Sequence, residues 1–396
     1  MTPPPSERPP ERGAEDDASG AIDGWKPLAL ALGASAEGAI DRVRRRFAER
    51  FRPDRRLHVV AYRGFGNRVS GTLSGRVLVY REPPDGEPDS LWRTLQRSYR
   101  RFETDEVPGV LVRATVDGEA PIETRSDGEG YFTVEVSVPD GFDGTALPVR
   151  LALPEHDDAL VAGSAAIALP GPEARLGVIS DIDDTVLVTE ATSLLKMMRL
   201  TLLESSESRV AFPGVAAFYA ALHAGRNPFF YVSSSPWNLY EFLEDFMSLK
   251  GIVAGPMLLR DFGLDRDKLV AGPHKDHKLG AIRSVLERQR ELPFVLIGDS
   301  GQHDPEIYAR IVEEYPARIL AVYIRDVSGD VRDRAVGDIA ARLEAAGVDL
   351  VLVPDTLAAA RHAASRGWLD EAALDGIRAD VGDELAPHVA LDEQQA

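Results

Sequence analysis

Apolar and polar positions follow two different patterns along this chain, and the change falls near residue 170. From residue 57 to residue 169, short apolar stretches alternate with polar positions, and Gly-, Pro- and Asp-containing breaks separate them. This texture predicts strands at 57–62, 72–80, 110–116, 131–138 and 148–153. Asp127-Gly128, shortly before Tyr131-Phe132-Thr133-Val134, is a hairpin signal. We therefore predict a small antiparallel β-sandwich domain over residues 57–170.

A second pattern begins after the Pro170-Gly171-Pro172 linker. Apolar runs now alternate with stretches that carry a helical pattern. Besides a strand that ends at Asp181, we expect strands at 229–232, 294–297, 319–324 and 350–353. We expect helices near 215–224, 239–249, 277–289 and 305–314. Strands that alternate with helices in this way indicate an α/β domain with a doubly wound parallel sheet, which we assign to residues 175–365.

Three further segments complete the predicted organisation. Residues 1–20 are rich in Pro, Glu and Asp and indicate a disordered leader, and residues 366–396 form an acidic tail. Residues 21–56 carry helical patterns, and another helix is expected over 91–102. The segment 42–56 contains eight arginines. It is either a basic helix that contacts an anionic membrane surface or a surface helix with a solvated basic face, and we favour the second interpretation.

Composition narrows the classes of function. The chain has 396 residues, 44% hydrophobic and 28% charged, as is typical of a globular protein. Its net charge of −19 argues against general nucleic-acid binding, which depends on Lys and Arg. There is no cysteine, so disulfides and thiol chemistry are excluded. No apolar run approaches the roughly 18 residues of a membrane-spanning helix. We therefore expect a cytoplasmic protein, with peripheral membrane contact as an option.

The most crowded charge lies in Gly177-Val178-Ile179-Ser180-Asp181-Ile182-Asp183-Asp184-Thr185-Val186. A predicted buried strand ends here in three carboxylates, and such crowding is costly unless a cation neutralises it. At the carboxyl end of a parallel strand, that cation is commonly a divalent metal. Asp181 and Asp183 project to the same side of an extended chain, so one can attack a phosphorus atom while the other moves a proton. The alternative is a solvated acidic turn.

Three other predicted strand or helix ends carry candidate chemistry. Ser233 can hydrogen-bond a phosphoryl oxygen, although serines at such turns are also ordinary helix caps. Lys278 can balance carboxylates and an incoming phosphate, although a lone lysine is more often a surface residue. Asp299 follows an apolar strand in Gly298-Asp299-Ser300-Gly301-Gln302-His303-Asp304 and suits a Mg²⁺ ligand. The oxygen-rich set favours magnesium over a transition metal bound by His274, His277 or His303.

These motifs occur in the order of a known superfamily. The pattern D-x-D-x-T, a serine, a lysine and then G-D-S-G-x-x-D resembles the haloacid dehalogenase superfamily of aspartate-nucleophile phosphotransferases. The finer sequence is similar to the App1-type phosphatidate phosphatase catalytic domain over about 176–326. The segments that carry this resemblance are Asp181-Ile182-Asp183-Asp184-Thr185, Phe212-Pro213-Gly214-Val215, Tyr231-Val232-Ser233-Ser234-Ser235-Pro236-Trp237-Asn238 and Gly298-Asp299-Ser300-Gly301-Gln302-His303-Asp304-Pro305-Glu306-Ile307-Tyr308.

The resemblance implies a mechanism and a site. Asp181 would be the nucleophile that forms an aspartyl-phosphate, and Asp183 the general acid and base. Thr185 would fix the loop, Ser233 would bind a phosphoryl oxygen, and Lys278 would hold the phosphate and Asp181. A Mg²⁺ ion would be bound by Asp181, the backbone carbonyl of Asp183, and Asp299, with Asp304 in support.

Substrate choice and overall role stay open. The apolar segment 193–203 lies where this superfamily inserts a cap, and it either packs on the sandwich or receives acyl chains. The first hypothesis for function is a Mg²⁺-dependent phosphatase acting on phosphatidate, an anionic phospholipid. The second is the same chemistry on a small soluble phosphomonoester. The third is a non-catalytic protein that binds a partner through the β-sandwich.

Overall fold

The computed structural model describes residues 56–80, 107–156, 165–182, 213–260, 274–300, 303–326 and 330–382. All of them belong to the second of two units into which the chain divides, Arg56–Ala396. Several expectations lie outside these residues: the leader, the arginine-rich segment up to residue 55, the helix at 91–102, the apolar segment 193–203 and the last part of the acidic tail. Residues 373–382 of that tail are helical.

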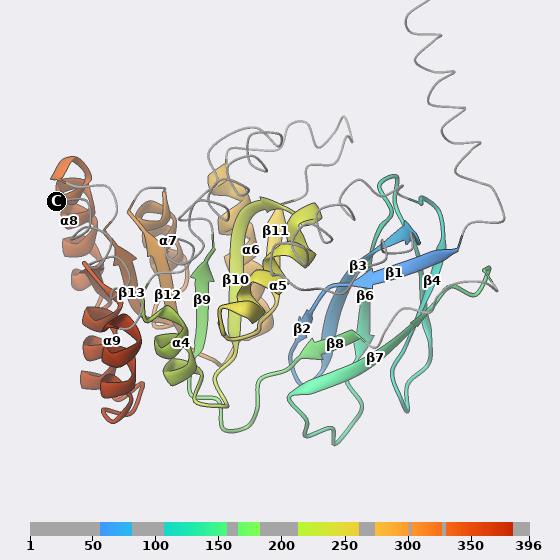
Figure 1. The fold of residues 1–396 in the computed structure, drawn as a ribbon, viewed down its shortest axis with the longest axis horizontal. Coiled ribbons are helices and arrows are strands. Elements are labelled where there is room, and N and C mark those ends of the chain that lie inside the picture. The colour runs from blue at the N-terminus through green and yellow to red at the C-terminus, as the bar shows by residue number, and fades with distance from the viewer. Residues whose placement is uncertain are drawn as a thin grey trace, which may run out of the picture. The chain divides into compact units, whose positions relative to one another are not determined.

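The first half of the described chain is one curled, mixed sheet of eight strands (Figure 1). Its strands are β1 (Leu57–Ala61), β2 (Gly64–Gly66), β3 (Ser70–Val79), β4 (Leu111–Thr115), β5 (Ile122–Arg125), β6 (Tyr131–Ser137), β7 (Ala146–Ala152) and β8 (Ala165–Ala168). The order is β1-β3-β2-β8-β7-β4-β5, and β6 pairs with β3. The pair β2–β8 is parallel and the others are antiparallel. The predicted strands are present, but their division into two stacked antiparallel sheets is not confirmed.

The core of this mixed-sheet region, residues 56–170, follows from strict alternation along the strands. In β6 and β7 every second side chain is buried and the others are exposed, except for the half-buried Tyr131 at the start of β6. Because side chains on a strand point alternately to opposite faces, one face of the sheet forms the core and the other meets solvent. Leu73, Val112, Val149 and Ile167 lie completely within this core.

The second half is a six-stranded sheet in which every strand pair is parallel. The order is β11 (Met257–Arg260), β10 (Phe229–Pro236), β9 (Gly177–Asp181), β12 (Phe294–Asp299), β13 (Ile319–Arg325) and β14 (Asp349–Val353). The helices are α4 (Val215–His223), a 3₁₀ turn η1 (Trp237–Leu239), α5 (Tyr240–Leu249), α6 (His274–Arg288), α7 (Asp304–Glu314), α8 (Asp330–Ala345) and α9 (Thr356–Ser365). The predicted α/β architecture with a parallel sheet is confirmed.

Helices cover both faces of this sheet, as two separate clusters of buried residues show. Val178 of β9 belongs to a cluster with residues of α4, α5 and α9. Its neighbour Ile179 belongs to a cluster with residues of α6, α7 and α8. Neighbouring residues of a strand face opposite ways, so a strand covered on both faces becomes a continuous apolar run, as in the sequence before Asp181. Within the described chain, no helix is long and apolar enough to cross a membrane.

Candidate active site

The three central strands of the parallel sheet bring the candidate residues to one edge. In β9, Asp181 is the last residue, and it lies beside Val232 of β10 in the ladder. On the other side of β9, β12 ends at Asp299. Helices α6 and α7 begin near the same edge; Lys278 is the fifth residue of α6 and Asp304 is the first residue of α7. The carboxyl edge of a parallel sheet is the usual ligand site in this class of fold.

Lys278 is the cation at the centre of the site. Its side chain is 4% exposed, and its Nζ lies 2.9 Å from Asp181 Oδ2 and 2.9 Å from Asp304 Oδ1. A buried charge is tolerated only when it is paired, because loss of its water shell costs several kcal/mol. The alternative that Lys278 is an ordinary surface residue is therefore wrong. The structure brings Lys278, Asp181 and Asp304 together as one charged cluster.

The carboxylates of Asp181, Asp299 and Asp304 form the second feature of the site. One oxygen from each lies within 4.8 Å of the others, and Asp299 and Asp304 are 1% and 0% exposed. Three carboxylates this close repel one another unless cations lie near them, and Lys278 contacts two of the three. Clustered carboxylate oxygens are the donors that Mg²⁺ prefers. The residues present therefore fit a magnesium ion.

Both carboxylate oxygens of Asp304 accept hydrogen bonds. Besides accepting from Lys278, it accepts a hydrogen bond from the backbone N–H of Asp299 through Oδ2, at 3.3 Å. This contact requires glycine at residue 298, where a Cβ would lie 2.4 Å from Asp304 Oδ2. Below it, Tyr308 donates to the carbonyl of Ile297 at 2.8 Å. Burial raises the pKa of Tyr308 well above its ordinary value, so this hydroxyl stays a neutral donor.

Ser233 differs from its predicted place. Strand β10 continues to Pro236, so Ser233 lies within the strand and does not follow it. The ladder with β11 is irregular between Val232 and Pro236, which is where the serines stand. Ser233 is fully buried, and its Oγ accepts a hydrogen bond from the N–H of Ser235 at 2.9 Å. This bond tightens the backbone beside Asp181, because β10 pairs directly with β9.

Two predicted catalytic residues, Asp183 and Thr185, lie outside the described residues, which end at Ile182 in this part of the chain. The same holds for Asp184 and for the side chain of His274. His303 caps α7 without a side-chain cap bond. Of the predicted site residues, the structure therefore describes Asp181, Ser233, Lys278, Asp299 and Asp304.

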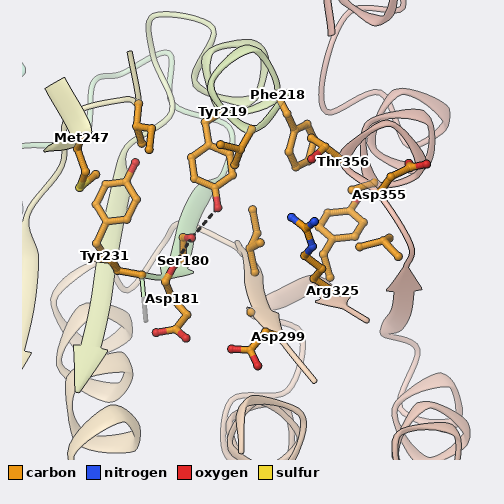
Figure 2. A pocket seen from close by; sticks show the side chains of 18 of the residues that line it. Ser180, Asp181, Phe218, Tyr219, Tyr231, Met247, Asp299, Arg325, Asp355 and Thr356 are labelled. Carbon is orange, nitrogen blue, oxygen red and sulfur yellow. Dashed lines mark hydrogen bonds between the residues drawn. The ribbon is translucent and has the colours of Figure 1, made fainter. Parts of the chain in front are cut away.

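A cavity of about 130 Å³ adjoins the carboxylates on one face of the sheet (Figure 2). Asp181 and Asp299 stand at one end of it, and Phe218, Tyr231 and Met247 are among the apolar residues in its wall. Burial inside it raises the pKa of Tyr219 to about 12. The hydroxyl of Tyr219 lies 2.7 Å from Ser180 Oγ, and this bond fixes the residue just before Asp181.

The sequence analysis did not single out three residues that line this cavity, Arg325, Asp355 and Tyr219. Arg325 ends β13 and lies opposite Asp299 in the ladder, and it lines the cavity together with Asp355. The signal that could have found Arg325 was its position, since it directly follows the predicted strand 319–324, just as Asp299 follows the predicted strand 294–297 by two residues. Tyr219 had no comparable signal, because a tyrosine on an apolar helix face is indistinguishable from a core residue.

The fold and site together define a class: an α/β protein whose parallel sheet carries a buried lysine–carboxylate cluster at its carboxyl edge, of a kind suited to a divalent metal. Residues 176–326 match the family model described as "Phosphatidate phosphatase APP1, catalytic domain". This segment is thus similar to an App1-type catalytic domain, and the resemblance seen in the motifs is confirmed.

Two curated yeast proteins match the same part of the chain. Phosphatidate phosphatase APP1 of Saccharomyces cerevisiae is 32% identical over 160 residues, which cover 40% of this chain and 27% of that protein. An uncharacterised protein of Schizosaccharomyces pombe is 31% identical over 159 residues, or 39% of this chain and 26% of its own. The chain thus matches about a quarter of the length of either relative.

Among solved structures, a carbohydrate acetylesterase from Xanthomonas citri matches 65% of each chain at 12% identity. Its TM-score of 0.22 is too low to support an argument.

Proposed function

We propose that this chain is a Mg²⁺-dependent phosphatase that hydrolyses a phosphomonoester through an aspartyl-phosphate, with phosphatidate as substrate and diacylglycerol as product. The observation that carries the proposal is the buried Asp181–Lys278–Asp304 cluster, with Asp299 beside it, inside the segment that matches the App1 catalytic domain. The arrangement of parallel strands and the order of the motifs support a fold of the haloacid dehalogenase type.

The chemistry divides into two steps. A carboxylate oxygen of Asp181 attacks phosphorus, the bond to the alkoxide leaving group breaks, and Asp183 gives that alkoxide a proton. Water then attacks the aspartyl-phosphate while Asp183 accepts its proton, and inorganic phosphate leaves. Lys278 orients Asp181 and offsets negative charge as the phosphoryl group arrives. Ser233 binds a phosphoryl oxygen and Thr185 fixes the loop that carries Asp183.

The metal would be held by Asp181, Asp299 and the backbone carbonyl of Asp183, with Asp304 as the supporting carboxylate. Magnesium supplies charge neutralisation on the transferring phosphoryl group. Asp304 suits a supporting role because the ammonium of Lys278 and the N–H of Asp299 already bind its two oxygens.

Two observations support a lipid as the substrate. The matched relative from Saccharomyces cerevisiae is itself called a phosphatidate phosphatase. The cavity beside Asp181 is walled mainly by apolar side chains, which suit an apolar part of a substrate better than a sugar or a nucleotide. We propose a cytoplasmic protein that meets its anionic phospholipid at a membrane surface, with the arginine-rich segment as a candidate contact.

The direct test is phosphate release from phosphatidate vesicles, with Mg²⁺ and with chelator, beside a panel of soluble phosphomonoesters. We expect release from vesicles that requires Mg²⁺ and disappears in Asp181→Asn. Faster turnover of a soluble ester would instead favour the second hypothesis for function. No release from any phosphomonoester by the folded protein would favour the non-catalytic hypothesis.

A further inference from the structure

The mixed-sheet region contacts the parallel-sheet region, residues 176–382, at the end of α6 opposite to Lys278. Arg288, the last residue of α6, donates from Nη1 to Ser70 Oγ at 2.7 Å and to Glu135 Oε1 at 2.8 Å, and from Nη2 to Thr72 Oγ1 at 3.0 Å. These three acceptors belong to β3 and β6. The bonds from Arg288 and Ser70 hold the pKa of Glu135 below its ordinary value, so the carboxylate stays charged.

Backbone contacts reinforce the same junction. Gln289, which is 3% exposed, donates from Nε2 to the carbonyl of Gly66 at 2.5 Å. In the reverse direction, Asn67 donates from Nδ2 to the carbonyl of Arg288 at 3.2 Å. Both the side chain and the carbonyl of Arg288 are therefore bound by the mixed sheet. Such a geometry fixes where the helix ends and how it is rotated about its axis.

A second junction holds the segment that follows Ser233. The ring of Tyr62 stacks on Trp237 of η1 at 4.7 Å between centroids, with 17° between the planes. The backbone N–H of Arg63 donates to the hydroxyl of Tyr240 at 2.7 Å, and its guanidinium pairs with Glu244 at 3.1 Å. Because η1 begins directly after β10, the mixed sheet restrains the segment next to the serines.

Helix geometry links the first junction to the site. Lys278 and Arg288 lie ten residues apart on one continuous helix, a distance of about 15 Å. One face of α6 packs on the parallel sheet through Ile282, Val285 and Leu286. The other face, with Gly280 and Ser284, lines a cleft shared with the mixed sheet. A displacement at the Arg288 end therefore moves the Lys278 end, and errors of about 1 Å in a catalytic group can cost on the order of a hundredfold in rate.

We propose that the mixed-sheet region braces the active site, and that Arg288 is a positioning residue: its bonds to Ser70, Thr72 and Glu135 hold α6 where Lys278 Nζ meets Asp181 and Asp304. This inference rests on the proposed phosphatase function for its kinetic consequence, but its structural consequence can be measured without turnover. It assigns the mixed sheet a role within the catalytic unit, in place of a separate partner-binding module.

The kinetic test uses p-nitrophenyl phosphate, a small soluble phosphomonoester that needs no membrane. For Arg288→Ala we expect kcat to fall by about tenfold with KM within about twofold of the wild type, because Lys278 is misplaced while the substrate pocket is intact. Arg288→Lys should recover part of the loss, since an ammonium still reaches one acceptor. Thr72→Val removes one acceptor with little change of volume, and it should give a smaller fall of the same kind.

The matched control is Arg113→Ala. Arg113 also forms an ion pair on a sheet strand, with Glu123 at 2.7 Å, but both partners lie within the mixed sheet. This variant should keep wild-type kcat and KM, while thermal unfolding and circular dichroism show whether either arginine variant has lost its fold. If Arg288→Ala and Thr72→Val both fold and both keep kcat within about twofold of the wild type, the inference is overturned.

Hydrogen exchange separates failure of this inference from failure of the proposed function. In Arg288→Ala, the amides of residues 278–282 should exchange faster than in the wild type, and in Arg113→Ala they should not. A wild type that releases phosphate neither from phosphatidate vesicles nor from any soluble ester would refute the phosphatase, yet faster exchange in Arg288→Ala would still support the brace. Unchanged exchange at 278–282 would overturn the brace, whatever the activity.

Discussion

The two sheets of this protein place their polar side chains differently. In the mixed sheet, Arg76 and Ser126 are the buried polar residues among those described, and both serve the fold. Arg76 donates to the carbonyl of Glu129 and stacks over Tyr131, and Ser126 bonds to Val107 and Val110. In the parallel sheet, buried Lys278, Asp299 and Asp304 gather at a single edge. The buried polar residues of the mixed sheet each bond to nearby backbone or ring atoms and stabilise the fold. The buried charged residues of the parallel sheet form one cluster, as expected of a site.

The physical reason is strand direction. Neighbouring strands of an antiparallel sheet run in opposite directions and end at opposite edges of the sheet. Residues that follow two successive strands are therefore separated by about the length of a strand. Parallel strands all end at one edge, so Asp181, Asp299 and the starts of α6 and α7 meet there although they are far apart in sequence. Among its described strands the mixed sheet has one parallel pair, β2–β8, and both strands consist of glycine and apolar residues without a charged or polar side chain.

The sharpest test of this comparison is Asp181→Asn. We expect phosphatase activity to fall by at least about a thousandfold, because an amide cannot form the acyl phosphate. The fold should persist, since the amide keeps the shape of the side chain, and circular dichroism would verify this. Substantial residual turnover would show that Asp181 is not the nucleophile and that the cluster is structural after all.

A core substitution in the mixed sheet should lower the stability of the protein and leave kcat unchanged, the reverse of what we expect for Asp181→Asn. Leu151 of β7 is 1% exposed, and Leu151→Ala should lower the free energy of unfolding by about 2–5 kcal/mol through the cavity it leaves. Urea titration measures this loss. At a temperature where the variant is fully folded, kcat should equal that of the wild type, because Leu151 lies on β7 and the bonds to Arg288 come from β3 and β6. A matching loss of kcat would show that the mixed sheet affects the active site through its whole core and not only through the bonds to Arg288.

Asp299→Asn and Asp183→Asn sharpen the roles within the parallel-sheet edge. Asp299→Asn should raise the Mg²⁺ concentration for half-maximal activity by about tenfold, because it removes one carboxylate ligand. Asp183→Asn should instead lower kcat at unchanged Mg²⁺ requirement, since its backbone carbonyl is the proposed ligand. A magnesium titration of both variants decides this, and identical titration curves would contradict the assignment.

The smallest expected effect concerns Glu314 of α7, which bonds to Arg283 of α6 and to Arg310 of α7. Hydrogen bonds from Arg283 and Arg310 lower the pKa of Glu314 to about 2. Because the pKa of Glu314 is lower in the folded protein than in the unfolded chain, its charge stabilises the fold at any pH above the ordinary carboxyl pKa of 4.5. That contribution is lost as the pH falls from 4.5 through about 2. Glu314→Gln should therefore cost about 1 kcal/mol or less at pH 7, with the difference from wild type vanishing near pH 2. Thermal unfolding at both pH values measures it; a constant difference would show that packing, and not charge, is what Glu314 contributes.

Much of the local structure was accessible from pattern alone. The strand before Asp181 and the helices at α4, α5, α6 and α7 were predicted close to their observed bounds, because apolar spacing reports which faces are covered. The strands β2, β5, β8 and β11 were missed, since segments of three or four residues are too short to show a period. Helices α8 and α9 were missed as well, and α9 buries alanines, which give weak contrast on an amphipathic face.

The sequence by itself determined the order of the chemical groups and the edge where they belong, because strand and helix periods are local and the D-x-D-x-T and G-D-S-G-x-x-D motifs stand at element ends. The sequence did not determine which strands pair, in which register, or which side chains meet across the fold. That Lys278 is buried between Asp181 and Asp304, that Gly298 makes room for Asp304, that Arg325 lies opposite Asp299, and that the first sheet is a single curled one all depend on ladder register and helix placement. Those are set by packing between residues that are distant along the chain, so only the tertiary structure decided them.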